Sequence, residues 1–202
     1  MKNSIDIKTK ELTPSLWSDL ERLFGENGAC GGCWCMSWRR EKDDDWKKIQ
    51  GAETKKRFKK LVTSGKAHGI LAYHDDEPIG WCSFDRRTDY VRLDRLPSLK
   101  CDDADLVWSV TCFFIKKDYR KQGVGSALLE HALKALKKHG AKIVEGYPVN
   151  PYSYGKNIPA AFAWTGTQSL FKKAGFKVVG NKGDSKERVR LYLQVNRLLI
   201  SL

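Results

Sequence analysis

The sequence contains no apolar run that approaches the roughly 20 residues needed to cross a bilayer. Its first ten residues are polar and lack the apolar core of a secretory signal. These two absences argue against a membrane partner and predict a cytoplasmic protein. Six cysteines without an export signal are expected to be reduced thiols, because disulfide frameworks belong to oxidising compartments.

Low-complexity segments, long linkers rich in Ser, Gly or Pro, and internal repeats are missing as well. A chain of 202 residues can bury a substantial core without a disulfide or a metal. Hydrophobic residues make up 41% and charged residues 30%, a balance that argues against a disordered chain. We therefore expect one domain over residues 1–202.

Acidic residues are scarce relative to basic ones: 24 Asp and Glu stand against 37 Lys and Arg, a net charge of +13. Such an excess suggests an anionic partner, which would be nucleic acid, an anionic membrane or a phosphorylated ligand. Much of it lies at 47–60 and 134–138, on helix faces expected to be solvated. No signature of RNA or DNA binding is present, so nucleic acid is disfavoured.

Hydrophobic periodicity predicts eleven elements in the order β-α-α-β-β-β-α-β-α-β-β. In chain order they cover about residues 5–7, 13–25, 42–62, 69–73, 78–84, 106–115, 126–139, 142–147, 167–174, 176–179 and 189–195. Segment 106–115 is apolar on both faces, as a central strand would be. The order predicts an α/β (α+β) fold with a mixed, largely antiparallel sheet flanked by helices and one central β-α-β crossover.

The turn Arg120–Ser126, RKQGVGS, lies between that central strand and an amphipathic helix. Free backbone N–H groups and the positive end of a helix can together bind phosphate oxygens. Gly123 and Gly125 would let a ligand approach the backbone closely. The turn lacks the Walker pattern, and Leu128 stands where a dinucleotide fingerprint needs its third glycine. An ordinary surface turn is the alternative.

A family resemblance begins in the same place. The segment IKKDYRKQGVGSALL resembles the acetyl-CoA signature [QR]-x-x-G-x-[GA] of the GNAT superfamily of acyl-CoA N-acyltransferases, through Arg120, Gly123 and Gly125. The hairpin at 71–84 and the segment SLFKKAGFKVV at 169–179 are similar to further elements of that family, in the same order. A Cys/Trp-rich N-terminal segment, VWSVTCFF and EGYPV resemble one prokaryotic subgroup.

The resemblance implies a GNAT-like fold with acetyl-CoA bound at its central crossover. Backbone groups of Phe113, Phe114 and Ile115 would pair with the pantetheine arm as an added strand does. Arg120 and Lys121 would add positive charge to a turn that holds the pyrophosphate through Gln122, Gly123, Val124, Gly125 and Ser126.

Acetyl transfer to an amine needs a deprotonated amine, a donor for the developing oxyanion and help for the departing thiolate. We expect the oxyanion donor to be a backbone N–H of strand 108–115. The family often supplies a tyrosine acid in the pattern L-Y-x-x-x-G-F, but Phe171 occupies that place, and Trp164 replaces an asparagine seven residues earlier. Another group supplies the proton, the thiolate leaves unaided, or the chain does not catalyse.

Glu145 and Tyr147 share one face of the strand after the helix, and are the predicted base and acid. Tyr152 and Tyr154 on the following loop are rivals for the acid role. The alternative is structural: Glu145 would be an ordinary paired carboxylate and Tyr147 a packing residue.

Trp34 and Trp38 lie where GNAT folds commonly shape the acceptor pocket, and the resemblance implies an aromatic wall for a cationic amine. The neighbouring Arg39 and Arg40 would instead favour an acidic acceptor, and the alternatives remain open. Three cysteines of the same segment suggest metal ligands, but zinc usually needs four, and no second cluster completes the set. We therefore predict no metal at Cys30, Cys33 and Cys35.

The sequence predicts an enzyme, an acetyl-CoA-dependent N-acetyltransferase acting on a primary amine of a small molecule or protein. The leading alternative is a non-catalytic acyl-CoA-binding or sensor module, motivated by Phe171 and Trp164; nucleic-acid binding ranks lower. A homodimer is left open.

Overall fold

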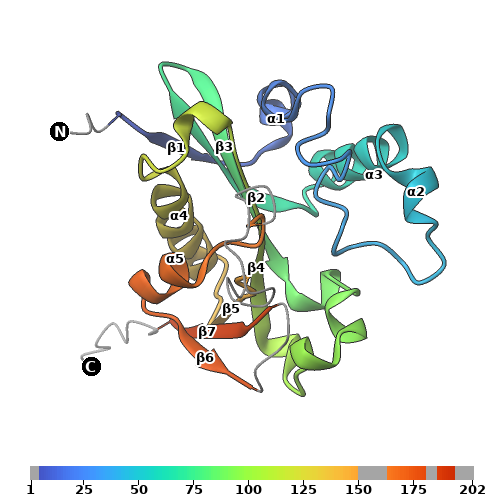
Figure 1. Cartoon of the computed structure of the whole chain (residues 1–202), viewed down its shortest axis with the longest axis vertical. Helices are drawn as coiled ribbons and strands as arrows, with labels where there is room; N and C mark the ends of the chain where they lie inside the picture. The colour runs from blue at the N-terminus through green and yellow to red at the C-terminus, as the bar shows by residue number, and fades with distance from the viewer. Residues whose placement is uncertain (1–4, 150–162, 181–185, 194–202) are drawn as a thin grey trace, which may run out of the picture.

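The computed structural model describes residues 5–149, 163–180 and 186–193. Seven strands form one sheet in the order β1-β2-β3-β4-β5-β7-β6 (Figure 1). The strands are β1 (Lys8–Glu11), β2 (His68–His74), β3 (Glu77–Arg86), β4 (Val107–Ile115), β5 (Ile143–Gly146), β6 (Lys177–Val179) and β7 (Arg188–Tyr192). Every neighbouring pair of these strands is antiparallel except β4 and β5. This confirms the predicted sheet and its single β-α-β crossover.

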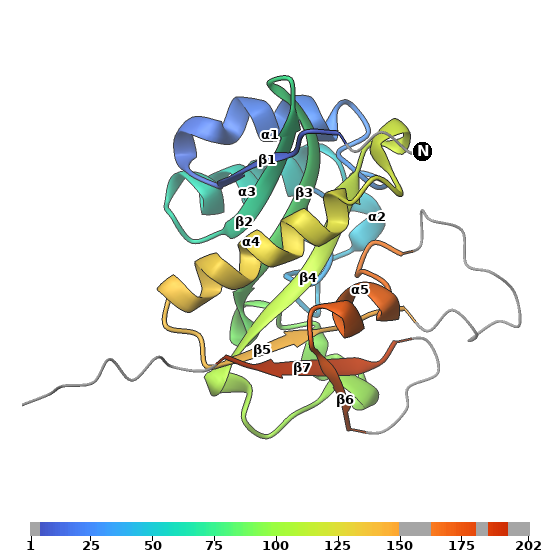
Figure 2. The ribbon, with the colours of Figure 1, turned by 90° about the vertical axis from the view of Figure 1, so that its left-hand side faces the viewer.

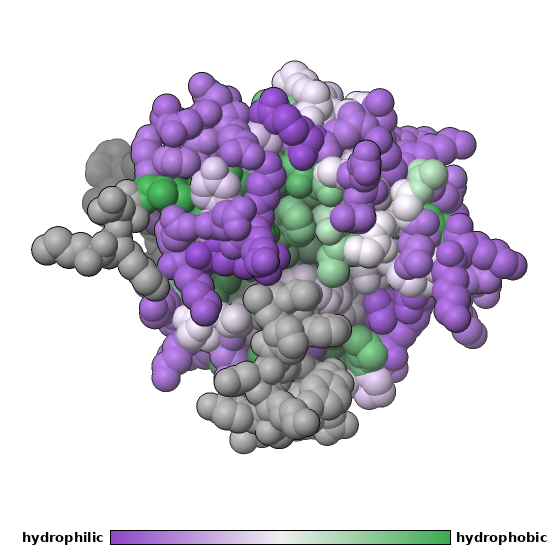
Figure 3. Space-filling view, turned by 45° about the horizontal axis from the view of Figure 1, so that its top comes forward, coloured by the Kyte–Doolittle hydropathy of each residue, from purple (hydrophilic) through white to green (hydrophobic). Residues whose placement is uncertain are grey.

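Helices cover both faces of the sheet, as Figure 2 shows. The helices are α1 (Trp17–Phe24), α2 (Trp46–Ile49), α3 (Ala52–Thr63), α4 (Val124–Lys138) and α5 (Gln168–Lys173). One core packs α4 and α5 against the sheet, and a second packs α1 and α3 against its other face. Hydrophilic residues dominate the view in Figure 3, and hydrophobic ones gather in a hollow strip near its centre.

The crossover helix α4 lies close against β3 because Gly80 has no side chain. A Cβ at Gly80 would lie 2.8 Å from Cγ1 of Val124 and 3.2 Å from Cδ1 of Leu128. Both residues are buried, and both belong to the apolar face of this helix. The sequence therefore fixes how the start of α4, and the turn before it, sit over the centre of the sheet.

Three predicted elements differ from the structure. The lysine-rich helix over 42–62 was a wrong prediction, because the chain breaks at Gly51, whose φ of +100° separates α2 from α3. The first strand is Lys8–Glu11 rather than 5–7, since Ile5 and Ile7 pack against the α4 core. Four short 3₁₀ turns lie between β3 and β4, in a segment expected to be mostly loop. Within the described residues, no helix has the length and apolar character to cross a membrane.

Candidate active site

The turn that precedes α4 has the geometry of an anion site. Gly123 is the residue before the helix and has φ +89°, a left-handed conformation that favours glycine. Its carbonyl accepts hydrogen bonds from Ser126 and Ala127, as the first turn of a helix requires. Helix α4 has 15 residues, so its amino end carries the partial positive charge of a full helix. An added Cβ at Gly123 would meet only Cδ1 of Ile7, at 4.0 Å, which leaves open space beside the backbone.

Side chains of the turn fasten it to the end of β4. Nε of Arg120 donates to the carbonyl of Ile115 at 3.0 Å, and Nε2 of Gln122 donates to the carbonyl of Asp118 at 2.6 Å. Lys121 is exposed and has φ +60°, which is uncommon for a residue with a side chain. Arg120 therefore holds the turn in place, and Lys121 is the cation exposed beside it.

A groove runs from this turn between α4 and α5. Apolar side chains and two charged ones line it: Ser126, Leu129, Glu130, Leu133, Leu170, Lys173 and Ala174. Gly125 precedes the first lining residue, and a Cβ on it would make ordinary contact with Ile115 and with Leu170 of the groove. The groove leads along the helix away from the anion site.

Strands β4 and β5 pair only as far as Val110 and Gly146, and beyond that point β4 continues paired with β3 alone. On β3, Ser83 pairs with Cys112 of β4 and Phe84 pairs with Val110. Thr111, between these two β4 residues, has no partner on β3 and forms a β-bulge. Beyond the bulge, the N–H of Phe113 donates to the carbonyl of Trp164 at 2.6 Å. The amide predicted to face pantetheine is thus already bonded to the segment that leads into α5.

Phe171 fills the space beside the separated strands. A Cβ on Gly146 would lie 2.2 Å from Cε1 of Phe171, and one on Gly166 would lie 2.7 Å from Cε2. The ring is fully buried and packs edge-on against Phe113 and Phe176. At the position where the resembled family often has a tyrosine, this chain places an apolar ring in its core.

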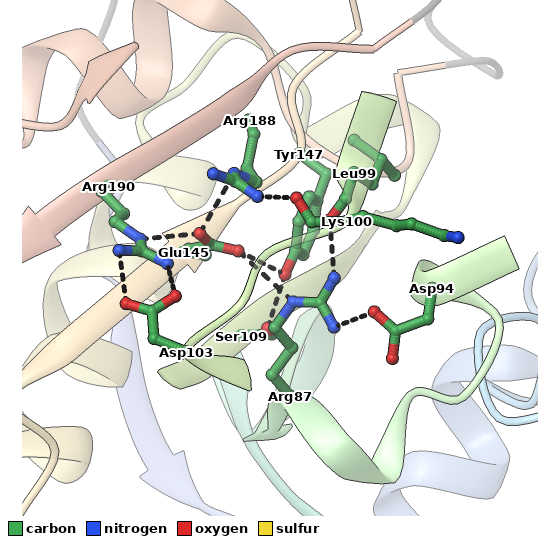
Figure 4. Close-up of polar contacts among 10 residues, drawn as sticks. All are labelled: Arg87, Asp94, Leu99, Lys100, Asp103, Ser109, Glu145, Tyr147, Arg188 and Arg190. Atoms are coloured by element: carbon green, nitrogen blue, oxygen red, sulfur yellow. Dashed lines mark hydrogen bonds and ion pairs between the residues drawn. The ribbon is translucent and has the colours of Figure 1, made fainter. Parts of the chain in front are cut away.

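Glu145 and Tyr147 lie together, as their shared strand face predicted, in a buried polar cluster (Figure 4). The Tyr147 hydroxyl donates to Oε2 of Glu145 at 3.0 Å and lies 2.7 Å from Oγ of Ser109. Oε1 of Glu145 accepts from Nε of Arg190 at 2.7 Å. Two more guanidinium Nε atoms lie near the carboxylate, that of Arg188 at 3.3 Å and that of Arg87 at 3.6 Å.

The arginines of this cluster have further anchors. Arg190 holds Asp103 through two hydrogen bonds of 2.6 and 2.8 Å, and Arg87 bonds Asp94 and the carbonyl of Leu99. Arg188 also donates to the carbonyl of Lys100. The cluster therefore joins β5 and β7 to the 3₁₀ segment that follows β3.

These contacts favour the structural reading of Glu145 and Tyr147. Three guanidinium groups surround the Glu145 carboxylate, as they would an ion-paired structural residue. Burial raises the pKa of Tyr147 well above its usual range, and the charge of Glu145 adds to the rise. A phenol held in that way is a weak acid. The base and acid roles stay a prediction, and the rivals Tyr152 and Tyr154 lie outside the described residues.

Trp34 and Trp38 are not parts of one wall. Trp34 stacks on Trp17, with ring centroids 5.8 Å apart, in the core beneath α1. Trp38 instead lies in a separate cluster with Tyr147 and Trp164, at centroid distances of 6.3 and 5.6 Å. Only Trp38 is therefore near the point where β4 and β5 separate.

The cysteines of the same segment are buried to different degrees and all are free thiols. Burial raises the pKa of Cys33 to about 11. Sγ of Cys35 accepts a hydrogen bond from Nε1 of Trp81 at 2.9 Å. Among residues 5–149, 163–180 and 186–193, no three His, Cys, Asp or Glu side chains are arranged to hold a metal ion.

Sequence reasoning missed two cations in the Trp38 cluster, Arg92 and Lys186. The guanidinium of Arg92 lies 5.2 Å from the Trp38 ring centroid, and Nζ of Lys186 lies 6.0 Å from it. Both residues come from polar connecting segments with no motif around them. Only the fold brings them to one indole.

Comparison with known proteins supports the fold. The sequence profile of the acetyltransferase (GNAT) family matches residues 33–153. No curated protein sequence matched the chain.

Solved structures similar to the chain include the PaiA N-acetyltransferase of Thermoplasma acidophilum in complex with coenzyme A, at 15% identity and a TM-score of 0.54 over 94% of this chain and 100% of that one. An N-acetyltransferase of Staphylococcus aureus Mu50 is 12% identical, with a TM-score of 0.54 over 94% and 99% of the two chains. YncA of Salmonella typhimurium, solved with its cofactor acetyl-CoA, is 11% identical, with a TM-score of 0.53 over 93% and 94%. At these identities, the likeness shows the fold alone.

Proposed function

Because the chain belongs to the GNAT acetyltransferase family, we propose that it transfers the acetyl group of acetyl-CoA directly to a primary amine. Residues 1–202 act as one domain, in the cytoplasm. The observation that carries the proposal is the left-handed Gly123 turn at the amino end of α4, near the end of β4, where the pairing with β5 has stopped. This turn offers backbone donors and open space where a phosphate-rich cofactor needs them.

The cofactor contacts are proposed as follows. The pyrophosphate binds the amides of Val124 and Gly125, and the exposed Lys121 adds charge. The pantetheine arm runs along the free edge of β4 from Phe113 to Ile115. For that, the Phe113 N–H must exchange its bond to the Trp164 carbonyl for one to the cofactor. The groove between α4 and α5 binds the rest of the cofactor.

The reaction balances without a covalent enzyme intermediate. The neutral amine attacks the thioester carbonyl carbon, an N–C bond forms and the C–S bond breaks. The attacking nitrogen gives up one proton and the departing thiolate takes one up, so the amide and the free thiol form with no net change in protons. Backbone N–H groups at the Thr111 bulge of β4 are the proposed oxyanion donors. Phe171 has no proton to give, and Tyr147 keeps its own within the arginine cluster. We therefore propose that water carries the proton from the nitrogen to the thiolate. The competing assignment has Glu145 as the base and Tyr147 as the acid.

The test is an amine screen in which two products are followed. We expect release of the free CoA thiol above the background of acetyl-CoA alone, together with an acceptor whose mass increases by one acetyl group. Both products must appear at the same rate. Thiol release without an acetylated acceptor would be hydrolysis and would contradict amine transfer.

A second function is favoured by one specific observation, the buried Phe171 ring at the usual acid position. An acyl-CoA sensor would bind acetyl-CoA tightly and turn over no amine in the same screen. That pair of results would replace the transferase proposal by the sensor.

A further inference from the structure

Two cations share one buried indole on the face of the sheet opposite α4. The guanidinium of Arg92 lies 5.2 Å from the ring centroid of Trp38, and Nζ of Lys186 lies 6.0 Å from it. Nζ of Lys186 is also 4.9 Å from the ring centroid of Trp164 and donates to Oγ1 of Thr165 at 2.8 Å. Both cations are half-buried, so they have lost part of their water.

Neither cation pairs with an acid in the described part of the chain. Arg92 has only Oγ and the carbonyl of Ser37, at 3.1 and 3.4 Å. Burial and, after it, the charge of Arg92 lower the pKa of Lys186 to about 8, against an opposing effect of Cys112. The other inward-facing arginines differ, because Arg87 and Arg190 each hold carboxylates.

The Trp38 indole adds a donor without an acceptor. Trp38 is 3% exposed, and its Nε1–H has no hydrogen-bond partner among the described residues. A buried donor without a partner costs about 1–3 kcal/mol. Within the described residues, two cations without an acid and one N–H without an acceptor therefore meet at a single ring, and together they suit an anion.

The cluster adjoins the proposed reaction centre. The carbonyl of Trp164 bonds the amide of Phe113 on β4, and the backbone of Lys186 bridges to Val149 just after β5. Cys112, which follows the β4 bulge directly, is near enough to Lys186 to affect its pKa. An acceptor seated at Trp38 would therefore reach the end of β4 from the side opposite α4.

We propose that Arg92, Lys186 and the indole N–H of Trp38 bind the carboxylate of the acceptor, which makes the substrate an amine that also carries an acid group. This inference rests on the proposed transferase function. A cationic acceptor does not fit, because the faces of Trp38 and Trp164 already carry the protein's own cations. The carboxylate would supply the charge that neither cation finds within the described residues.

The test is calorimetry with N-acetylglycine and N-acetylglycinamide, in the presence of CoA. These probes resemble the product of an acidic acceptor and differ only in the carboxylate. We expect the wild type to bind the acid at least ~10-fold more tightly than the amide, because a charged hydrogen bond contributes about 1.5–3 kcal/mol. Lys186→Gln should remove most of that preference, and Arg92→Gln should act in the same direction.

Lys177→Gln is the matched control, because Lys177 is an exposed lysine of β6 with no ion pair in the described ranges. The Lys177→Gln variant should prefer N-acetylglycine over N-acetylglycinamide as strongly as the wild type does. Equal binding of acid and amide by the wild type, or no binding of either, would overturn the subsite, as would an unchanged preference in Lys186→Gln. If the acid binds as expected and no amine is acetylated in the screen, the transferase proposal fails while the anion subsite stands.

Discussion

Glu145→Gln separates a structural carboxylate from a general base. Glu145 is fully buried, and three guanidinium Nε atoms lie within 3.6 Å of its oxygens. The variant keeps the shape but leaves the fully buried Arg87 with only the half-exposed Asp94 as a charged partner. Breaking a buried ion pair costs about 3–5 kcal/mol, and the amide oxygen keeps part of the hydrogen bonding, so we expect a loss of about 3 kcal/mol. For 202 residues this lowers Tm by about 6–12 °C.

Thermal unfolding and kcat/KM measured on the same preparations decide between the two roles. Asp94→Asn is the matched control, because it removes a carboxylate from the same Arg87 at the exposed end, where a pair contributes at most about 1 kcal/mol. We expect Glu145→Gln to retain kcat/KM within a few-fold below its Tm. A wild-type Tm with a rate reduced by about 10²–10⁴-fold, the usual contribution of a general base, would refute the structural reasoning.

Three further predictions concern packing and pH. Gly146→Ala should lower the free energy of unfolding, measured by chemical denaturation, by about 1–3 kcal/mol, because its Cβ would lie 2.2 Å from Cε1 of Phe171. Adding Phe171→Leu should restore part of that stability, and strictly additive effects of the two substitutions would contradict the contact. The bond to Asp85 raises the pKa of His68, so its stabilisation is complete below about pH 6.5 and is lost as the pH rises through the raised value. His68→Gln should therefore lose more stability at about pH 5.5 than at about pH 8.5, and an equal loss would exclude this linkage. Burial lowers the pKa of Lys186 to about 8, so the affinity of the wild type for N-acetylglycine should fall as the pH rises through about 8, while that of Lys186→Gln stays level. Parallel curves of affinity against pH for the two proteins would rule out carboxylate binding by Lys186.

Much of the fold could be predicted from local patterns. The polar pair Asp75 and Asp76 both have positive φ, as a two-residue hairpin turn between β2 and β3 requires. The doubly apolar segment 106–115 is the central strand β4, and the glycine-bearing turn precedes the crossover helix. The long lysine-rich helix was the main error, because Gly51 adopts φ +100° and interrupts a continuous periodic pattern.

The chemistry of the site depended on contacts that sequence patterns do not reveal. Strand alternation placed Glu145 beside Tyr147, but it could not reveal that arginines from distant segments enclose the carboxylate. Only three residues lie between Trp34 and Trp38, yet the chain has a positive φ at Trp34 and the two indoles enter different cores. Such long-range pairings are fixed by tertiary packing.

The +13 charge acquires a partial explanation in the structure. Lys121 lies exposed beside the anion turn, and Arg92 and Lys186 lie half-buried at one indole. These cations suit two negatively charged groups, a pyrophosphate and a carboxylate. These three cations account for a part of the excess.

Calorimetric titration of acetyl-CoA into two glycine variants tests the central claim, that the Gly123 turn binds the cofactor. Gly123→Glu places a carboxylate against the pyrophosphate, and like charges brought together cost several kcal/mol, so affinity should fall at least ~100-fold. Gly140→Glu introduces the same side chain at the other end of α4, with a similar backbone (φ +76° against +89°) and open space around it. The account predicts saturable binding to the wild type and to Gly140→Glu, and its loss in folded Gly123→Glu. Equal affinity in both variants would contradict it.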